Sequence, residues 1–205
     1  MVQPELMTAT AAPLRSGETR EGERFDATDF SDAELDFSTF VSCTFDRCRF
    51  DLATLRGVHF AECNLHGLDA PVFSAPRSSW RSVEVTASRL GSAELYESSW
   101  RSVVISDAKI NYLNARTASW TDVVFRNCVI EELDLGHASV TRMDLQDCQI
   151  GTLDLTGARL GDVNLRTAGL DQLKGLAGLA GAWISEDQLT RLAPLLAAHL
   201  KINIG

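Results

Sequence analysis

Every fifth residue from Phe25 to Leu170 is apolar, at all 30 positions. A second slot lies two residues before each of these, and from Ala33 to Ala168 it holds only Ala, Ser, Cys, Val, Leu, Phe or Met. The other three residues of each five carry the charged and turn-forming side chains. Neither a helix of 3.6 residues per turn nor a two-residue strand alternation stays in phase with a period of five. The chain must therefore turn a corner every five residues.

A longer period of 20 residues is visible in a column of tryptophans. Trp80, Trp100 and Trp120 recur within the related strings SSWRSV, SSWRSV and ASWTDV. Four corners of five residues close a square coil with this longer period, so identical side chains stack from one coil to the next. Such stacking is what the core of a β-solenoid requires. The pattern predicts an all-β solenoid in which the three tryptophans form a core ladder.

The tripeptides around the inward slots resemble the pentapeptide-repeat family, whose motif is roughly Ala-(Asp/Asn)-Leu-X-X. The close matches are Ala33-Glu34-Leu35, Cys63-Asn64-Leu65, Ala93-Glu94-Leu95, Leu133-Asp134-Leu135, Leu153-Asp154-Leu155 and Val163-Asn164-Leu165. The resemblance covers about 150 residues and implies a right-handed quadrilateral β-helix. Members of the family differ in function, so the resemblance is specific for fold and much less so for function.

Three segments are predicted: a flexible N-terminal tail at residues 1–20, the β-helix at residues 21–170, and a C-terminal α-helical cap at residues 171–205. Ser185 and Gln188 have the spacing of a capping box that begins a helix. The apolar face that follows is formed by Leu189, Leu192, Leu195 and Leu196. We expect this face to cover the open end of the coil and to bury its surplus surface against a second copy, giving a homodimer.

Residues that could carry out chemistry are scattered. The five cysteines all occupy the small inward slot: Cys43, Cys48, Cys63, Cys128 and Cys148. We expect them to be small buried side chains in a reducing compartment rather than disulfides or metal ligands. His59 and His66 flank inward slots, with no convergent ligands nearby. No phosphate-binding loop, nucleophile elbow or His-Glu-X-X-His string occurs, so we predict a non-enzymatic protein without catalytic residues, cofactor or metal.

The overall charge excludes some classes of partner. With 19 Lys and Arg against 28 Asp and Glu, the net charge is −9, and such a protein is repelled by nucleic-acid phosphates. No apolar run approaches the roughly 18 residues of a membrane span, and the N-terminus does not read as a secretory signal. We therefore expect a cytoplasmic protein that binds neither membranes nor nucleic acids directly.

The charge is also uneven along the chain. Residues 25–70 and 131–170 have net charges of −6 and −4, whereas residues 71–130 are net +2. One corner column carries acids at multiples of 20 residues and is the predicted partner-binding surface: Glu34, Glu94, Asp134 and Asp154. Coils stacked at about 4.8 Å give a rod of about 36 Å, the length of roughly ten base pairs. The quinolone-resistance pentapeptide-repeat proteins act as DNA mimics on DNA gyrase, so the resemblance implies protection of gyrase from inhibitors such as fluoroquinolones.

The same sequence features also allow a second function. The unbroken register leaves no room for the long projecting loops of some gyrase-protecting members, and the basic middle third interrupts the acidic surface. Acids at corners also have a structural explanation, because Asp and Asn favour turns. The alternative is a structural or scaffold module whose flat faces bind an unrelated protein partner.

Overall fold

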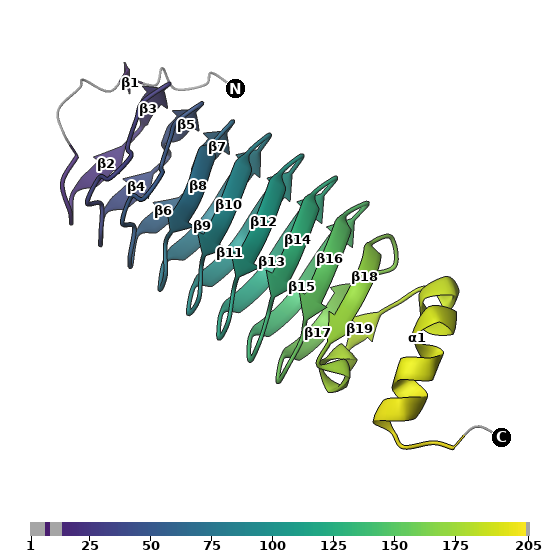
Figure 1. The fold of residues 1–205 in the computed structure, drawn as a ribbon. Helices are drawn as coiled ribbons and strands as arrows, with labels where there is room; N and C mark the ends of the chain where they lie inside the picture. The colour runs from purple at the N-terminus through teal and green to yellow at the C-terminus, as the bar shows by residue number, and fades with distance from the viewer. Residues whose placement is uncertain (1–6, 9–13, 204–205) are drawn as a thin grey trace.

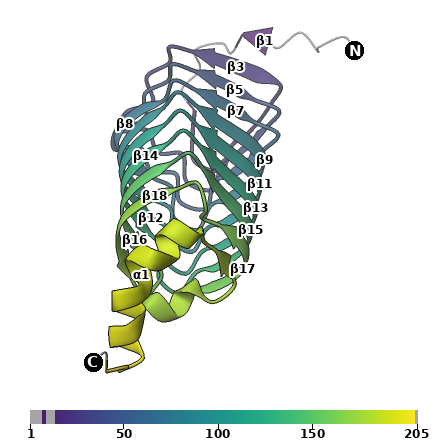
Figure 2. The ribbon, with the colours of Figure 1, turned by 90° about the vertical axis from the view of Figure 1, so that its right-hand side faces the viewer.

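The computed structural model describes residues 7–8 and 14–203. The chain winds into a parallel β-solenoid of about eight turns, and a single helix, α1 (Glu186–His199), lies at its C-terminal end (Figure 1). Figure 2 shows the turns stacked as a tube, with α1 in front of the last turn. The predicted β-helix with a C-terminal helical cap is therefore confirmed.

The wall of the tube consists of two parallel sheets. The larger sheet contains β1 (Met7–Thr8), β2 (Thr19–Glu21), β3 (Glu23–Asp26), β4 (Thr39–Val41), β5 (Thr44–Asp46), β6 (His59–Ala61), β7 (Asn64–His66), β9 (Ser79–Thr86), β11 (Ser99–Ser106), β13 (Ser119–Arg126), β15 (Ser139–Gln146), β17 (Arg159–Asn164) and β19 (Ala182–Trp183). The smaller sheet contains β8 (Asp69–Ser74), β10 (Arg89–Glu94), β12 (Lys109–Asn114), β14 (Val129–Asp134), β16 (Gln149–Asp154) and β18 (Gly169–Lys174).

Strand pairing repeats the 20-residue period, so each inward residue stacks on its equivalent in the next turn. Trp80, Trp100 and Trp120 are register partners on β9, β11 and β13, and at most 3% of each is exposed. The rings of Trp100 and Trp120 are stacked with centroids 4.3 Å apart. Phenylalanines continue this aromatic column toward the N-terminus, where Phe40 and Phe60 stack at 5.3 Å. Burial of these inward columns supplies the main hydrophobic driving force of the fold.

The corners are made by residues with positive φ, which turn the chain sharply. At one corner the residues are Ser82, Ser102, Asp122 and Arg142, with φ between 54° and 57°. Another corner changes along the tube: Asp32 and Leu52 have φ of 58° and 57°, but their equivalents from Val72 onward do not have positive φ. From β8 onward the chain therefore passes this corner within a continuous strand, and only the first two turns have the sharp form.

The N-terminal end of the core is covered by charged residues. Arg20 is the register partner of Phe40, and its guanidinium pairs with Glu18 at 2.9 Å and with Glu23 at 3.4 Å. These charges protect the first strand from edge-to-edge association. The coil thus includes β2, although part of this strand was predicted to be flexible tail. That prediction arose because the inward slots of β2 are charged and break the apolar pattern. Residues 1–6 and 9–13 of that predicted tail lie outside the described residues.

The C-terminal end is closed by η1 (Leu176–Leu179), β19 and α1. Ser185 and Gln188 form the predicted capping box, with hydrogen bonds of 3.2 and 2.8 Å. The Gln188 side chain is also buried and donates to the backbone oxygens of Leu165 at 2.8 Å and Ala168 at 2.9 Å. One amide therefore fastens the first turn of α1 to the last turn of the solenoid.

Candidate interaction surfaces

The four acids predicted to bind a partner do share one column of the solenoid. Backbone pairing aligns it as Glu34, Thr54, Ser74, Glu94, Asn114, Asp134, Asp154 and Lys174. Three neutral residues and one lysine stand between or after the acids. The column is therefore an interrupted series of charges rather than a continuous negative stripe.

Asp134 is committed to an ion pair within the chain. Its carboxylate accepts hydrogen bonds from Arg116 Nη1 at 3.0 and 3.1 Å and from the backbone N–H of Gly136 at 2.8 Å. Only 9% of its side chain is exposed. Burial, together with nearby carboxylates including that of Asp134, raises the pKa of Tyr112 beside it. Because its charge is already neutralised, Asp134 is unsuited to the predicted contact with a partner, and its environment indicates a structural role.

The other three acids differ in the number of hydrogen bonds that their carboxylates accept within the chain. Glu94 accepts hydrogen bonds from the Asn114 amide at 2.7 Å and from the Ser92 hydroxyl at 3.0 Å. Asp154 accepts the backbone N–H of Thr156 at 2.8 Å; burial alone would raise the pKa of Asp154, but its hydrogen bonds with Thr156 outweigh burial and the pKa is lowered. Glu34 is exposed and makes no side-chain hydrogen bond or ion pair with any described residue.

Free carboxylates are concentrated on one side of the rod, here called the acidic side: residues 29–36 and their equivalents at multiples of 20 residues, which include the smaller sheet. Among the described residues, the carboxylates without an ion-pair partner on this side are Asp29, Asp32, Glu34, Asp36, Asp51, Asp69, Glu94, Glu131, Asp154 and Asp171. The corresponding unpaired bases are Arg15, Arg49, Arg56, Arg89 and Lys109. Residues 29–36 contribute four of these acids and no base, so the first turn is the most acidic part.

The middle of the rod carries cations on both sides. On the acidic side, Arg89 and Lys109 are register partners on β10 and β12. On the larger sheet, Arg81 and Arg101 are exposed register partners on β9 and β11. None of the four pairs with a carboxylate within the described part of the chain. Like charges on adjacent strands repel, so these turns would favour an anionic partner rather than a basic one.

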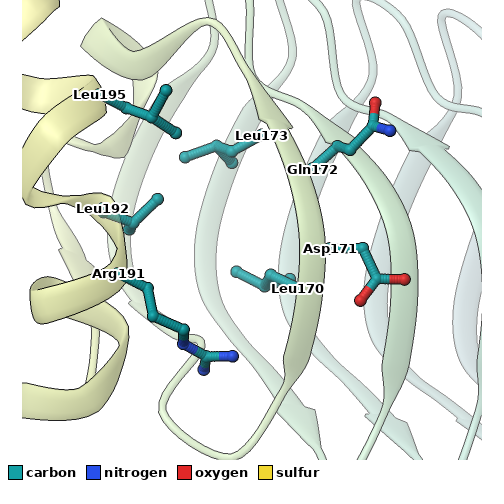
Figure 3. A pocket seen from close by; sticks show the side chains of 7 residues that line it. All are labelled: Leu170, Asp171, Gln172, Leu173, Arg191, Leu192 and Leu195. Carbon is teal, nitrogen blue, oxygen red and sulfur yellow. The ribbon is translucent and has the colours of Figure 1, made fainter.

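A groove separates α1 from the last turn of the solenoid (Figure 3). Leu170 and Leu173 of β18 face Leu192 and Leu195 of α1 across a space of about 560 Å³. Half of Leu189 and of Leu195 is exposed to solvent, and Leu196 is half-buried. The leucines predicted to cap the core therefore do so incompletely. The closer contacts with the end of the core come from Leu179, Ala182 and Ile184.

The cysteines are free and buried at all five positions, as the inward register predicts. A neighbouring thiol one turn away and burial together raise the pKa of Cys63, and the same causes raise the pKa of Cys148. Both thiols therefore stay protonated and unreactive. Within residues 7–8 and 14–203, no group of three His, Cys, Asp or Glu side chains is placed to hold a metal ion. Over the same residues, no helix has the length and apolarity to cross a membrane.

The architecture defines the class of protein: a filled repeat solenoid that presents flat faces and corners, where ligands meet a surface instead of a deep cleft. The sequence model of one family, described as Pentapeptide repeats (8 copies), matches residues 28–67. This segment is thus built of pentapeptide repeats, and the 20-residue register of the strands continues through β18. No curated protein sequence matches the chain.

Solved structures of two pentapeptide-repeat proteins are similar to the chain. HetL, involved in heterocyst differentiation regulation in the cyanobacterium Nostoc sp. strain PCC 7120, is 15% identical; the match covers 86% of this chain and 93% of HetL, with a TM-score of 0.44. Full-length QnrB1, a plasmid-mediated fluoroquinolone resistance protein, is 20% identical; the match covers 89% of this chain and 91% of QnrB1, with a TM-score of 0.37.

Proposed function

We propose that the chain is a protein-binding rod that mimics DNA, docking its acidic side on the basic DNA-binding surface of another protein. The observation that carries the proposal is the surplus of unpaired carboxylates on that side, ten against five bases among the described residues. Complementary charge speeds encounter and selects the partner. Eight turns at about 4.8 Å give a length near that of eleven base pairs. DNA gyrase is the specific candidate, and the chain would protect it from inhibitors such as fluoroquinolones.

The proposal includes a homodimer formed through the C-terminal segment. The groove between β18 and α1 leaves Leu195 half exposed beside Leu170, Leu173 and Leu192. A second copy related by a two-fold axis would bury the same surface on both chains. End-to-end pairing would double the length of the acidic rod. Light scattering of the Leu189→Glu/Leu195→Glu variant tests this directly, because both leucines are half exposed and can be changed without disturbing the core; a monomer is the expected result.

The deciding experiment measures gyrase supercoiling and drug-induced DNA cleavage with increasing amounts of the protein. We expect inhibition of supercoiling, or rescue from a fluoroquinolone, at stoichiometric protein. The Asp32→Asn/Glu34→Gln variant neutralises two exposed acids of the first turn and should weaken the effect about tenfold, a loss typical of removing charge complementarity. The matched control, Glu84→Gln/Asp147→Asn, removes the same charge from β9 of the larger sheet and from the corner that follows β15, and should act like the wild type. No effect at micromolar protein would overturn the assignment to gyrase.

A scaffold module is the second candidate, and the cations of the middle turns favour it. Arg81 and Arg101 on one side, with Arg89 and Lys109 on the other, would be repelled by a basic DNA-binding surface. They suit a partner whose own charges alternate in sign. If the protein leaves gyrase unaffected, capture of partners from a lysate is compared between the wild type and a variant in which Arg81 and Arg101 are neutralised. Weaker capture by the variant would support the scaffold function, and unchanged capture would exclude Arg81 and Arg101 as the contact.

A further inference from the structure

Two large apolar side chains are exposed at corners of the first two turns. Phe37 is 60% exposed and Leu52 is 56% exposed. Most other residues at corners are small, charged or glycine, such as Gly17, Gly57 and Arg77 at the corner that contains Phe37. One exposed apolar residue is ordinary, but these two bound the same face of the solenoid, which contains residues 33–36 and 53–56.

The ring of Phe37 is held in a defined position. It lies over Gly57 in the next turn, where an added Cβ would come within 2.7 Å of the ring Cδ1. The backbone N–H of Phe37 also donates to the Arg56 carbonyl at 2.8 Å. Glycine therefore makes room for the ring, which stays fixed against the wall of the solenoid while more than half of the residue remains exposed. A rigid aromatic loses little entropy when a partner covers it.

Leu52 is held at the opposite edge of the face. Its backbone N–H donates to the Val72 carbonyl at 3.2 Å. It lies at the sharp form of the corner, which occurs only in the first two turns. The leucine side chain is consequently presented to solvent at the same end of the rod as Phe37.

Exposed carboxylates surround the two apolar residues. Asp32 and Glu34 are exposed and form no ion pair with any described residue. Asp36 is half-buried and accepts the backbone N–H of Arg56 at 2.9 Å. The bases of this face at this end of the rod are Arg56 and, one turn before Leu35, the exposed Arg15. The surface is therefore apolar at two edges and negative between them.

We propose that Phe37 and Leu52 are the apolar anchors by which the first two turns grip a protein partner, and that the partner segment is basic and amphipathic. Carboxylates alone would give long-range attraction and strong salt dependence, whereas buried aromatic and aliphatic anchors supply most of the affinity at protein interfaces. The complementary segment must therefore place aliphatic side chains between lysines or arginines. This inference deepens the proposed function, since it identifies which part of the acidic side makes the contact.

A second copy of this chain is the poorer occupant. Its unpaired cations Arg81 and Arg101 lie beside Ser82 and Ser102 at a corner of β9 and β11. No large exposed apolar residue of the described chain adjoins them. The exposed leucines of α1 flank Arg191, but the same helix carries Glu186 and Asp187 and is therefore not basic. The patch thus fits a partner with a basic amphipathic segment better than it fits another copy.

The first test measures binding of the full chain to the gyrase holoenzyme. The Phe37→Asn/Leu52→Asn variant removes both anchors, and asparagine tolerates the positive φ of these corners, so the fold should be retained. We expect binding at least tenfold weaker than wild type, as for the loss of interface anchors. The matched control is Val104→Asn, which removes an outward, half-buried apolar side chain from β11 of the larger sheet, away from the acidic side, and it should bind normally.

A second probe separates this inference from the identity of the partner. An 18-residue helical peptide of leucine and lysine, with one apolar face, is titrated into labelled protein and followed by NMR. We expect shifts centred on residues 32–37 and 52–57, with at least tenfold weaker binding to the double variant and to wild type with a lysine–serine peptide of equal charge. The assignment of Phe37 and Leu52 as anchors would be overturned if the double variant bound the leucine–lysine peptide as tightly as the wild type does. Equal affinity of the wild type for the lysine–serine peptide, or shifts centred elsewhere, would overturn it as well. Peptide binding without gyrase binding would overturn gyrase as the partner and leave the anchors in place.

Discussion

Two tryptophans in identical sequence strings have different hydrogen bonding, which allows a matched test of the core. Trp80 Nε1 donates to Ser78 Oγ at 2.8 Å. In the next turn, Trp100 Nε1 and Ser98 Oγ are both buried without a partner. Replacing either tryptophan by phenylalanine removes a similar volume from a similar environment. The two variants therefore differ mainly in what happens to the indole N–H and to the serine hydroxyl.

The magnitudes follow from these contacts. Trp80→Phe breaks a buried hydrogen bond and leaves the Ser78 hydroxyl unpaired, which costs about 1–3 kcal/mol beyond the loss of ring volume. Trp100→Phe removes a donor that is already unpaired, so about 1–3 kcal/mol of desolvation penalty is relieved. We expect Trp80→Phe to be the more destabilising by at least about 2 kcal/mol. Trp100→Ala removes the whole ring and should cost about 3–5 kcal/mol.

The assay is equilibrium unfolding in urea, followed by far-UV circular dichroism because the variants change the tryptophan fluorescence. The comparison holds if the denaturant slope is the same for all variants. Equal costs for the two phenylalanine variants, or a larger cost for Trp100→Phe, would refute the reasoning from the unpaired N–H. A cost below about 1 kcal/mol for Trp100→Ala would place the tryptophan column outside the core.

Three further variants test single contacts. Arg116→Met leaves the Asp134 carboxylate nearly buried without its ion pair, and thermal unfolding should show a loss of about 3 kcal/mol. Gln188→Ala removes two hydrogen bonds to the last turn and should accelerate hydrogen exchange throughout α1 and β18, whereas unchanged exchange would show that the helix is fastened by other contacts. Arg142 lowers the pKa of Asp122 by hydrogen bonding, so its stabilisation is present above the unfolded pKa and disappears as pH falls through the folded pKa. Melting temperatures of wild type and Arg142→Met should therefore differ above the unfolded pKa of Asp122 and converge as the pH falls below its folded pKa.

The candidate interaction surface could be predicted only in part from the sequence. The 20-residue period places Glu34, Glu94, Asp134 and Asp154 in one column, and strand pairing confirms the column. The sequence could not show that Arg116 neutralises Asp134, because that contact joins two adjacent turns through side-chain conformation. The net charge of residues 25–70 includes the carboxylates of residues 29–36, but net charge alone does not show that these four lie together on one side of the rod without ion pairs.

Phe37 and Leu52 were missed, although the sequence does contain a signal for them. Both fall in the outward slot two residues after an inward residue, where the repeat otherwise favours small, polar or charged side chains. An apolar residue in that slot cannot reach the core, so it must be exposed. The inward slots do not reveal these two residues, because an apolar residue in an outward slot leaves the five-residue register unbroken.

The sequence by itself determined the solenoid, its inward columns and the presence of the capping helix. In a repeat coil every core contact joins residues at a constant offset, so a one-dimensional period is sufficient to specify which side chains stack. Tertiary structure alone decided which charges are free, where the N-terminal end of the core closes, and how far α1 stands from β18. These features depend on the reach of individual side chains between turns and on the shape of each corner, and neither follows from the period.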